Sequence, residues 1–196
     1  MKKWNSITER FAESKAFVGE LEVLAEIDAP QFQIPEYNEE NPDPEGNYYG
    51  PSIGTQGGCF NGQYFYQSFL KYCYSTNEAY PTAHHVNDAG NFVKIIKYDV
   101  LNGKMYAVSE QMQCLNHCND MTYYPKKNQL LVCNSRGNKK RITFLNADTM
   151  VYEGHKELDV ELYAISYHEK TDRFILGISG VRQFAIANGD FSEVVT

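Results

Sequence analysis

The chain lacks long apolar runs and concentrated basic segments, and each absence excludes a class of partner. No stretch of about 18 consecutive apolar residues occurs, so the sequence predicts no membrane-spanning helix. Its 18 Lys and Arg are outnumbered by 25 Asp and Glu, which gives a formal net charge of -7. Nucleic-acid binding needs a concentrated basic face, and the short basic runs at 126–127 and 139–141 fall beside predicted turns. We expect no membrane and no nucleic-acid partner.

Familiar motifs of catalysis and targeting are also absent. The sequence contains no G-x-S-x-G, no glycine-rich phosphate loop and no H-E-x-x-H, which excludes the hydrolase and nucleotide-binding classes that those motifs mark. Met1 and the two lysines after it resemble the start of a signal peptide, but charged residues follow where an apolar core belongs. The chain as given is therefore predicted to be cytoplasmic.

Cysteines are too few and too scattered for a disulfide scaffold, because only five occur, at 59, 73, 114, 118 and 133. Cys114, His117 and Cys118 suggest zinc, but a second ligand pair at matching spacing is missing. Cys59 and Cys133 lie in apolar strand patterns, where a thiol usually serves as a small buried side chain. We predict no bound metal and no cofactor.

What the sequence does contain is a repeat. Residues 121–133 return as residues 165–177, and each copy reads as a short apolar strand, a polar turn and a second apolar strand. The 15 Tyr and 11 Phe favour pleated, half-buried surfaces. A strand-built period of about 44 residues is typical of a β-propeller blade, a four-stranded sheet that packs radially against its neighbours. The sequence predicts an all-β fold of propeller-type blades.

Three units fit the blade pattern, and together they span residues 53–196. The middle unit has predicted strands at 119–124, 129–134, 140–145 and from 150, and the last unit at 163–167, 173–179, 181–186 and 191–195. The first unit has predicted strands at 56–60, 63–69, 94–99 and from 104, with a polar insertion at 75–90. Tight turns are expected at the Asn-Gly pairs 61–62, 102–103 and 188–189.

Three blades do not usually close a ring, since propellers have about four to eight. Either the chain is part of a larger one, or two copies complete a ring as a homodimer, or the N-terminus adds a partial blade. Residues 1–52 differ in kind from the repeats. Apolar residues at helical spacing over 4–25 predict a helix, although 17–27 also suits a strand of a preceding blade. Five prolines and many acidic residues over 29–51 predict an irregular linker.

The inner strands of a propeller line its channel, and the loops that enter them form one rim. The entry positions here combine an amide, an imidazole, a carboxylate and a phenol, which suits a polar ligand. His117 has the pKa range of a base near neutral pH, and Asn119 and Asp120 offer oxygens of the kind that calcium prefers. Turn capping through backbone hydrogen bonds is the alternative role for Asp120. The predicted ligand site comprises Gln56, His117, Asn119, Asp120 and Tyr163.

A second cluster, His84, His85 and Asp88, lies in the polar insertion, where it reads more simply as part of a surface loop.

The strand endings resemble those of bacterial propeller repeat proteins of the YVTN and quinoprotein-like type. In those proteins a later strand ends in D-x-x-(T/N)-G-K. Residues 98–104, Tyr-Asp-Val-Leu-Asn-Gly-Lys, match this ending well, and 144–149 and 184–189 match it loosely. The resemblance covers about residues 53–196 and implies a fold more than an activity.

Two narrower resemblances concern enzymes. Thr55-Gln56-Gly57 is similar to the opening of plant-type glutaminyl cyclase propellers, but Gln67 stands where their catalytic glutamate would be, so the activity is not carried over. Gluconolactonase-type propellers hold a divalent metal with Glu, Asn and Asp, and Asn119 and Asp120 would suit two of these roles. No Glu stands at a channel-entry position of the three units.

The sequence therefore favours a non-catalytic binding or scaffolding module that uses the channel mouth or the rim loops. Its partner would be a protein or a small polar ligand. The alternative is a propeller enzyme, lactonase-like or cyclotransferase-like, with its site in the channel.

Overall fold

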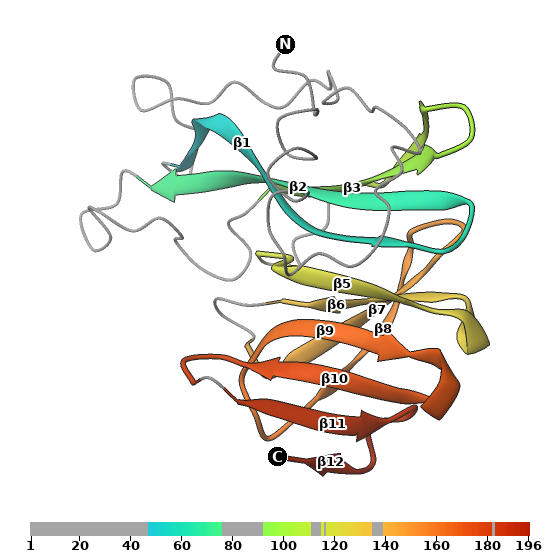
Figure 1. Ribbon diagram of the computed structural model, residues 1–196. Coiled ribbons are helices and arrows are strands. Elements are labelled where there is room, and N and C mark those ends of the chain that lie inside the picture. The colour runs from blue at the N-terminus through green and yellow to red at the C-terminus, as the bar shows by residue number, and fades with distance from the viewer. Residues whose placement is uncertain (1–46, 76–91, 111–114, 116, 135–138, 182) are drawn as a thin grey trace, which may run out of the picture.

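The computed structural model describes residues 47–75, 92–110, 115, 117–134, 139–181 and 183–196. These residues form three four-stranded antiparallel sheets, each with its strands in sequence order (Figure 1). The first blade comprises β1 (Asn47–Phe60), β2 (Tyr64–Ser75), β3 (Phe92–Asp99) and β4 (Lys104–Val108). The second comprises β5 (Asp120–Tyr124), β6 (Gln129–Cys133), β7 (Arg141–Asn146) and β8 (Tyr152–Glu157). The third comprises β9 (Leu162–His168), β10 (Arg173–Ile178), β11 (Phe184–Asn188) and β12 (Val194–Val195). The prediction of an all-β fold of propeller-type blades is confirmed.

The 44-residue repeat is reproduced in backbone geometry. A 3₁₀ turn joins the first two strands of the second blade (η2, Pro125–Lys127) and of the third (η3, Glu169–Thr171). Each turn ends in a left-handed residue, Asn128 at φ 51 and ψ 49 and Asp172 at φ 52 and ψ 46. Asn and Asp tolerate this conformation better than most residues with side chains, which explains their recurrence at this point of the repeat.

The second blade packs against a neighbour on each face, because successive apolar residues of its strands point to opposite faces of the sheet. Leu130, Val132 and Leu145 join a core shared with Tyr66 and Leu70 of the first blade. Leu131, Cys133 and Ile142 belong to a second core, shared with the third blade. The third-blade members of that core are Leu162, Ile165, Phe174, Leu176, Ala185, Ala187 and Phe191. Most of the buried apolar side chains of the described residues therefore lie between neighbouring blades, and a smaller cluster of Phe69, Ile96 and Tyr98 lies on the other side of the first blade.

The outer strands depart from the sequence-based expectation. Strand β8 begins at Tyr152 and β12 at Val194, whereas strands were expected from 150 and 191. Met150 and Phe191 both have positive φ, 59 and 56, and both are buried. Each is a turn residue that contributes an apolar side chain to a core, so its apolar character does not mark the start of a strand.

The first and third blades differ from expectation at other points. Strand β1 begins at Asn47, inside the segment expected to be a linker, and β11 begins at Phe184, three residues after the expected 181. The expected N-terminal helix, most of the linker and nearly all of the polar insertion lie outside the described residues. None of the helical turns in the described part of the chain has the length and apolarity of a membrane-spanning helix.

Candidate functional site

The predicted site lies where the inner strands of the three blades run side by side, with β5 between β1 and β9 (Figure 1). Gln56 is part of β1, Asp120 opens β5 and Tyr163 is near the start of β9. Residues 117 and 119 lie just before β5. The His117 ring is buried, and its backbone N–H donates to the Asn134 carbonyl (3.1 Å). The Tyr163 side chain is 57% exposed.

Asp120 links two blades through its carboxylate. Oδ1 accepts the N–H of Met121 (2.9 Å), and Oδ2 accepts the N–H of Ile165 in the third blade (2.9 Å). Two neighbouring side chains make similar links, because the Asn119 amide donates to the Tyr163 carbonyl (2.8 Å) and Thr122 Oγ1 accepts the Tyr167 N–H (3.2 Å). Side chains of β5 and of the residue before it thus satisfy backbone groups along the edge strand β9, where unpaired groups are costly.

The first and second blades meet through backbone contacts. The Gly57 N–H donates to the Cys118 carbonyl (3.0 Å), and the Ser68 hydroxyl donates to the Gly57 carbonyl (3.0 Å). A Cβ on Gly57 would lie 2.5 Å from the Cα of Asp120, so only glycine permits this approach. Gln56 therefore sits one residue from the seam between the blades.

Gln67, which stands where a cyclase-type propeller would have its glutamate, makes structural hydrogen bonds. Its side-chain Nε2 donates to the carbonyls of Gln56 (2.7 Å) and Gly57 (3.2 Å). A carboxylate accepts hydrogen bonds but does not donate them, so glutamate would place a negative charge against these two oxygens. The Gln67 amide thus satisfies backbone carbonyls on β1.

Burial governs the electrostatics around Asp120. It raises the pKa of Asp120 above its usual range, and the N–H groups of Ile165 and Met121 partly offset that effect. Burial also raises the pKa values of the Cys59 and Cys133 thiols, with the Asp120 and Cys118 groups adding to the effect. These two cysteines are neutral thiols at neutral pH, which does not suit a nucleophile. Among the described residues, no three His, Cys, Asp or Glu side chains form a group that could hold a metal ion.

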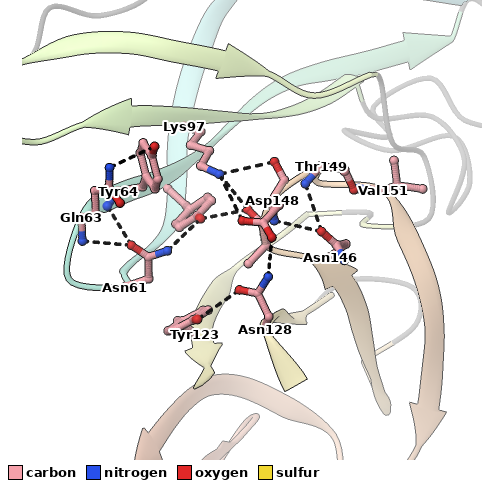
Figure 2. A network of polar contacts seen from close by, with 12 residues as sticks. Asn61, Gln63, Tyr64, Lys97, Tyr123, Asn128, Asn146, Asp148, Thr149 and Val151 are labelled. Atoms are coloured by element: carbon pink, nitrogen blue, oxygen red, sulfur yellow. Dashed lines mark hydrogen bonds and ion pairs between the residues drawn. The ribbon is translucent and has the colours of Figure 1, made fainter. Parts of the chain in front are cut away.

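A second polar cluster, around Lys97, lies between the first two blades (Figure 2). The buried Lys97 ammonium donates to the carbonyls of Ala147 (3.2 Å) and Asp148 (3.3 Å) and is 3.9 Å from the Asp148 carboxylate. It lies 4.2 Å from the centroid of the Tyr64 ring, within cation–π range. Tyr66 donates to the same Ala147 carbonyl (2.9 Å).

The Lys97 cluster has a structural role that sequence reasoning missed. Burial lowers the pKa of Lys97, and the Asp148 carboxylate partly offsets this effect. A signal was present, because Lys97 falls in period-two alternation with the apolar residues Val93 and Ile95, which predicts that it faces the core. The cluster ties the turn after β7 to the first blade.

The structure brings together Asn119, Asp120 and Tyr163, and it places Gln56 close to them across the Gly57 to Cys118 contact. His117 is buried, so it does not present its ring to solvent at the rim. The cluster of His84, His85 and Asp88 lies outside the described residues.

No family model and no curated protein matches the sequence. Among 92 matching chains of solved structures is a crystal structure from Bacteroides ovatus ATCC 8483, assigned as a dipeptidyl aminopeptidase IV. The identity is 12% and the TM-score 0.44, and the match covers 76% of this chain and 26% of that one. Nothing about the activity of this chain follows from a match at that level, and the resemblance to YVTN-type repeats stays a prediction.

Proposed function

We propose that this protein is a non-catalytic binding module of the propeller type, with its contact surface at the channel-end rim around Tyr163. The observation that carries the proposal is that two residues of the predicted site, Asp120 and Tyr163, differ in their hydrogen bonding and exposure. Both oxygens of Asp120 accept backbone N–H groups, one of them from Ile165 on β9, whereas Tyr163, two residues earlier on β9, is 57% exposed. The carboxylate holds blades together, and the phenol is free to contact a partner.

The rim suits an extended segment of another protein. A tyrosine ring supplies apolar area and one hydroxyl at small entropic cost, which is why tyrosine is enriched at binding hot spots. The Asn119 amide donates to the Tyr163 carbonyl, so the backbone that carries the ring is tied to the second blade. The half-buried Gln56 beside this rim supplies an amide for hydrogen bonds to a peptide backbone.

The test is selection of peptides from a phage-displayed random library on the wild-type protein. Peptides that use the rim bind Tyr163→Ala at least about tenfold more weakly than wild type. Tyr106→Ala is the matched control, because Tyr106 is 62% exposed but lies on β4, the outer strand of the first blade. Peptides that bind Tyr163→Ala as tightly as wild type would overturn the proposal.

One observation favours the enzyme alternative. A partly buried carboxyl with a raised pKa is a common general acid or base, and Asp120 has both properties. The probes are hydrolysis of γ-butyrolactone and cyclisation of a peptide with an N-terminal glutamine. Turnover by wild type that is lost in a folded Asp120→Asn protein would replace the binding proposal with a catalytic one.

A further inference from the structure

The third blade has an apolar face that no described residue of the chain covers. This third-blade face consists of Ile175, Phe184, Ile186 and Val195, which are 42%, 69%, 53% and 58% exposed. They lie on the side of the sheet opposite Phe174, Leu176, Ala185 and Ala187, which are buried against the second blade. Ile175, Ile186 and Val195 pair across three neighbouring strands, so they form a contiguous exposed apolar patch, which is a feature of interaction surfaces.

The repeat relates this third-blade face to a surface of the second blade that is buried. Leu131 of the second blade lies 44 residues before Ile175, and the two pair with Phe144 and Ile186 in their own sheets. Ile142, paired with Cys133, is the counterpart of Phe184, paired with Gly177. In the second blade Leu131 and Ile142 are 1% and 0% exposed, because the third blade covers them. The third-blade face therefore keeps the apolar side chains of a blade-docking surface.

The centre of the corresponding face of the first blade is already buried. Phe69, Ile96 and Tyr98 lie on the side of the first blade that faces away from the second, and they are 6%, 0% and 3% exposed. A homodimer that completed a ring would join the third-blade face of one copy to this first-blade face of the other. The centre of that first-blade face is already buried, and its exposed apolar residues, Phe60, Met105 and Val108, lie on the edge strands β1 and β4. Among the described residues, the third-blade face has exposed apolar side chains on three neighbouring strands, so its best match is the same face of another copy.

Charge also permits self-association at this place. The chain carries a net charge of -7, which opposes contact between copies in general. On the third-blade face, Arg173 and Glu193 form an ion pair (3.7 Å), so their charges offset one another. The apolar surface is thus bordered by a neutral pair.

We propose that two copies of this protein associate through their third-blade faces, packed sheet against sheet about a two-fold axis. The contact is isologous, so each residue of the face meets the same face of the partner. Two antiparallel sheets packed in this way form the core of a β-sandwich, in which side chains of the facing sheets interdigitate. This inference does not rest on the proposed rim function, since the two surfaces share no residue.

The first test is the molar mass in solution by light scattering, with Ile186→Glu as the probing variant. Wild type is expected at about twice the 22.4 kDa of one chain. Ile186→Glu is expected to raise the dimer dissociation constant at least about 30-fold. Met105→Glu is the matched control, because Met105 is also 53% exposed on a strand but lies on β4 of the first blade. Circular dichroism melting verifies that both variants fold.

The second test separates the isologous contact from a ring. Ile186→Lys is expected to be monomeric, as Ile186→Glu is, but an equimolar mixture of the two variants regains the dimer. In a ring, position 186 of one copy would face the first blade of the other, and mixing would restore nothing. A monomeric wild type, an unchanged dimer in Ile186→Glu, dissociation by Met105→Glu or a monomeric mixture each overturns the proposal.

Discussion

At the scale of single residues, polar side chains that the sequence suggests as ligand-binding groups form hydrogen bonds between the blades. Asp120, predicted as a ligand residue with turn capping as its alternative, caps the Ile165 N–H of the next blade. The sequence identified its importance, because Asp before a strand commonly bonds to backbone groups. It did not identify the partner, because a bond across 45 residues depends on how the blades pack.

Asp120→Ala is expected to lower the free energy of unfolding by about 1–3 kcal/mol, since a backbone N–H between blades loses its acceptor. Asn119→Ala is expected to cost less, because its bond to the Tyr163 carbonyl is exposed. Urea denaturation of wild type and both variants checks this. Equal stability of Asp120→Ala and wild type would show that the carboxylate is not a link between blades.

Gln67→Glu is expected to destabilise the fold at neutral pH, because the carboxylate faces the carbonyls of Gln56 and Gly57. That environment raises the folded-state pKa of the introduced carboxyl above its unfolded value. The native state then binds a proton more readily than the unfolded state, so the deficit shrinks as the pH falls. The protonated acid again has an O–H to donate.

The measurement is the difference in unfolding free energy between Gln67→Glu and wild type across the acidic range. Gln63→Glu is the matched control on an exposed residue beside the same hairpin, and its effect is expected to be small at every pH. A deficit in Gln67→Glu that did not depend on pH would contradict the donor role of the amide.

At the scale of elements, the second and third blades were predictable because their strands are short and alternate regularly. Strand starts at 129, 173 and 163 were predicted within one residue, since polar turns precede each of them. The starts of the outer strands β8 and β12 were predicted too early, because Met150 and Phe191 are apolar residues in left-handed turns. A pattern of apolar residues does not distinguish a strand from a turn that contributes a side chain to the core.

The close contact between β1 and β5 requires a glycine at position 57. Gly57→Ala is expected to lower the free energy of unfolding by about 1–3 kcal/mol, because its Cβ would overlap the Asp120 backbone. Gly54→Ala is the control on the same strand, where the nearest atom to a Cβ is the Gln56 side chain at 3.5 Å. Thermal melting compares the two, and equal melting temperatures would mean that β1 and β5 separate without cost.

At the scale of the whole molecule, the blades form a linear series in which the second contacts both others. Stability in such a series is approximately a sum of blade terms and nearest-neighbour interface terms. The sequence predicted the series through its repeat, but it did not show which face of which blade is exposed. That property depends on which surfaces the rest of the chain covers, and Phe69 and Phe184 are equally apolar in sequence yet opposite in exposure.

Hydrogen exchange is expected to follow this order. Opening the second blade breaks two interfaces, whereas opening the third breaks only the one it forms with the second. In the Ile186→Glu variant, where association is removed, amides of β6 and β7 are therefore expected to exchange most slowly. Those of β11 and β12 are expected to exchange fastest among the strands of these two blades, because β12 pairs through only two residues. Mass spectrometry of peptic fragments measures this, and a second blade that exchanged as fast as the third would refute the nearest-neighbour description.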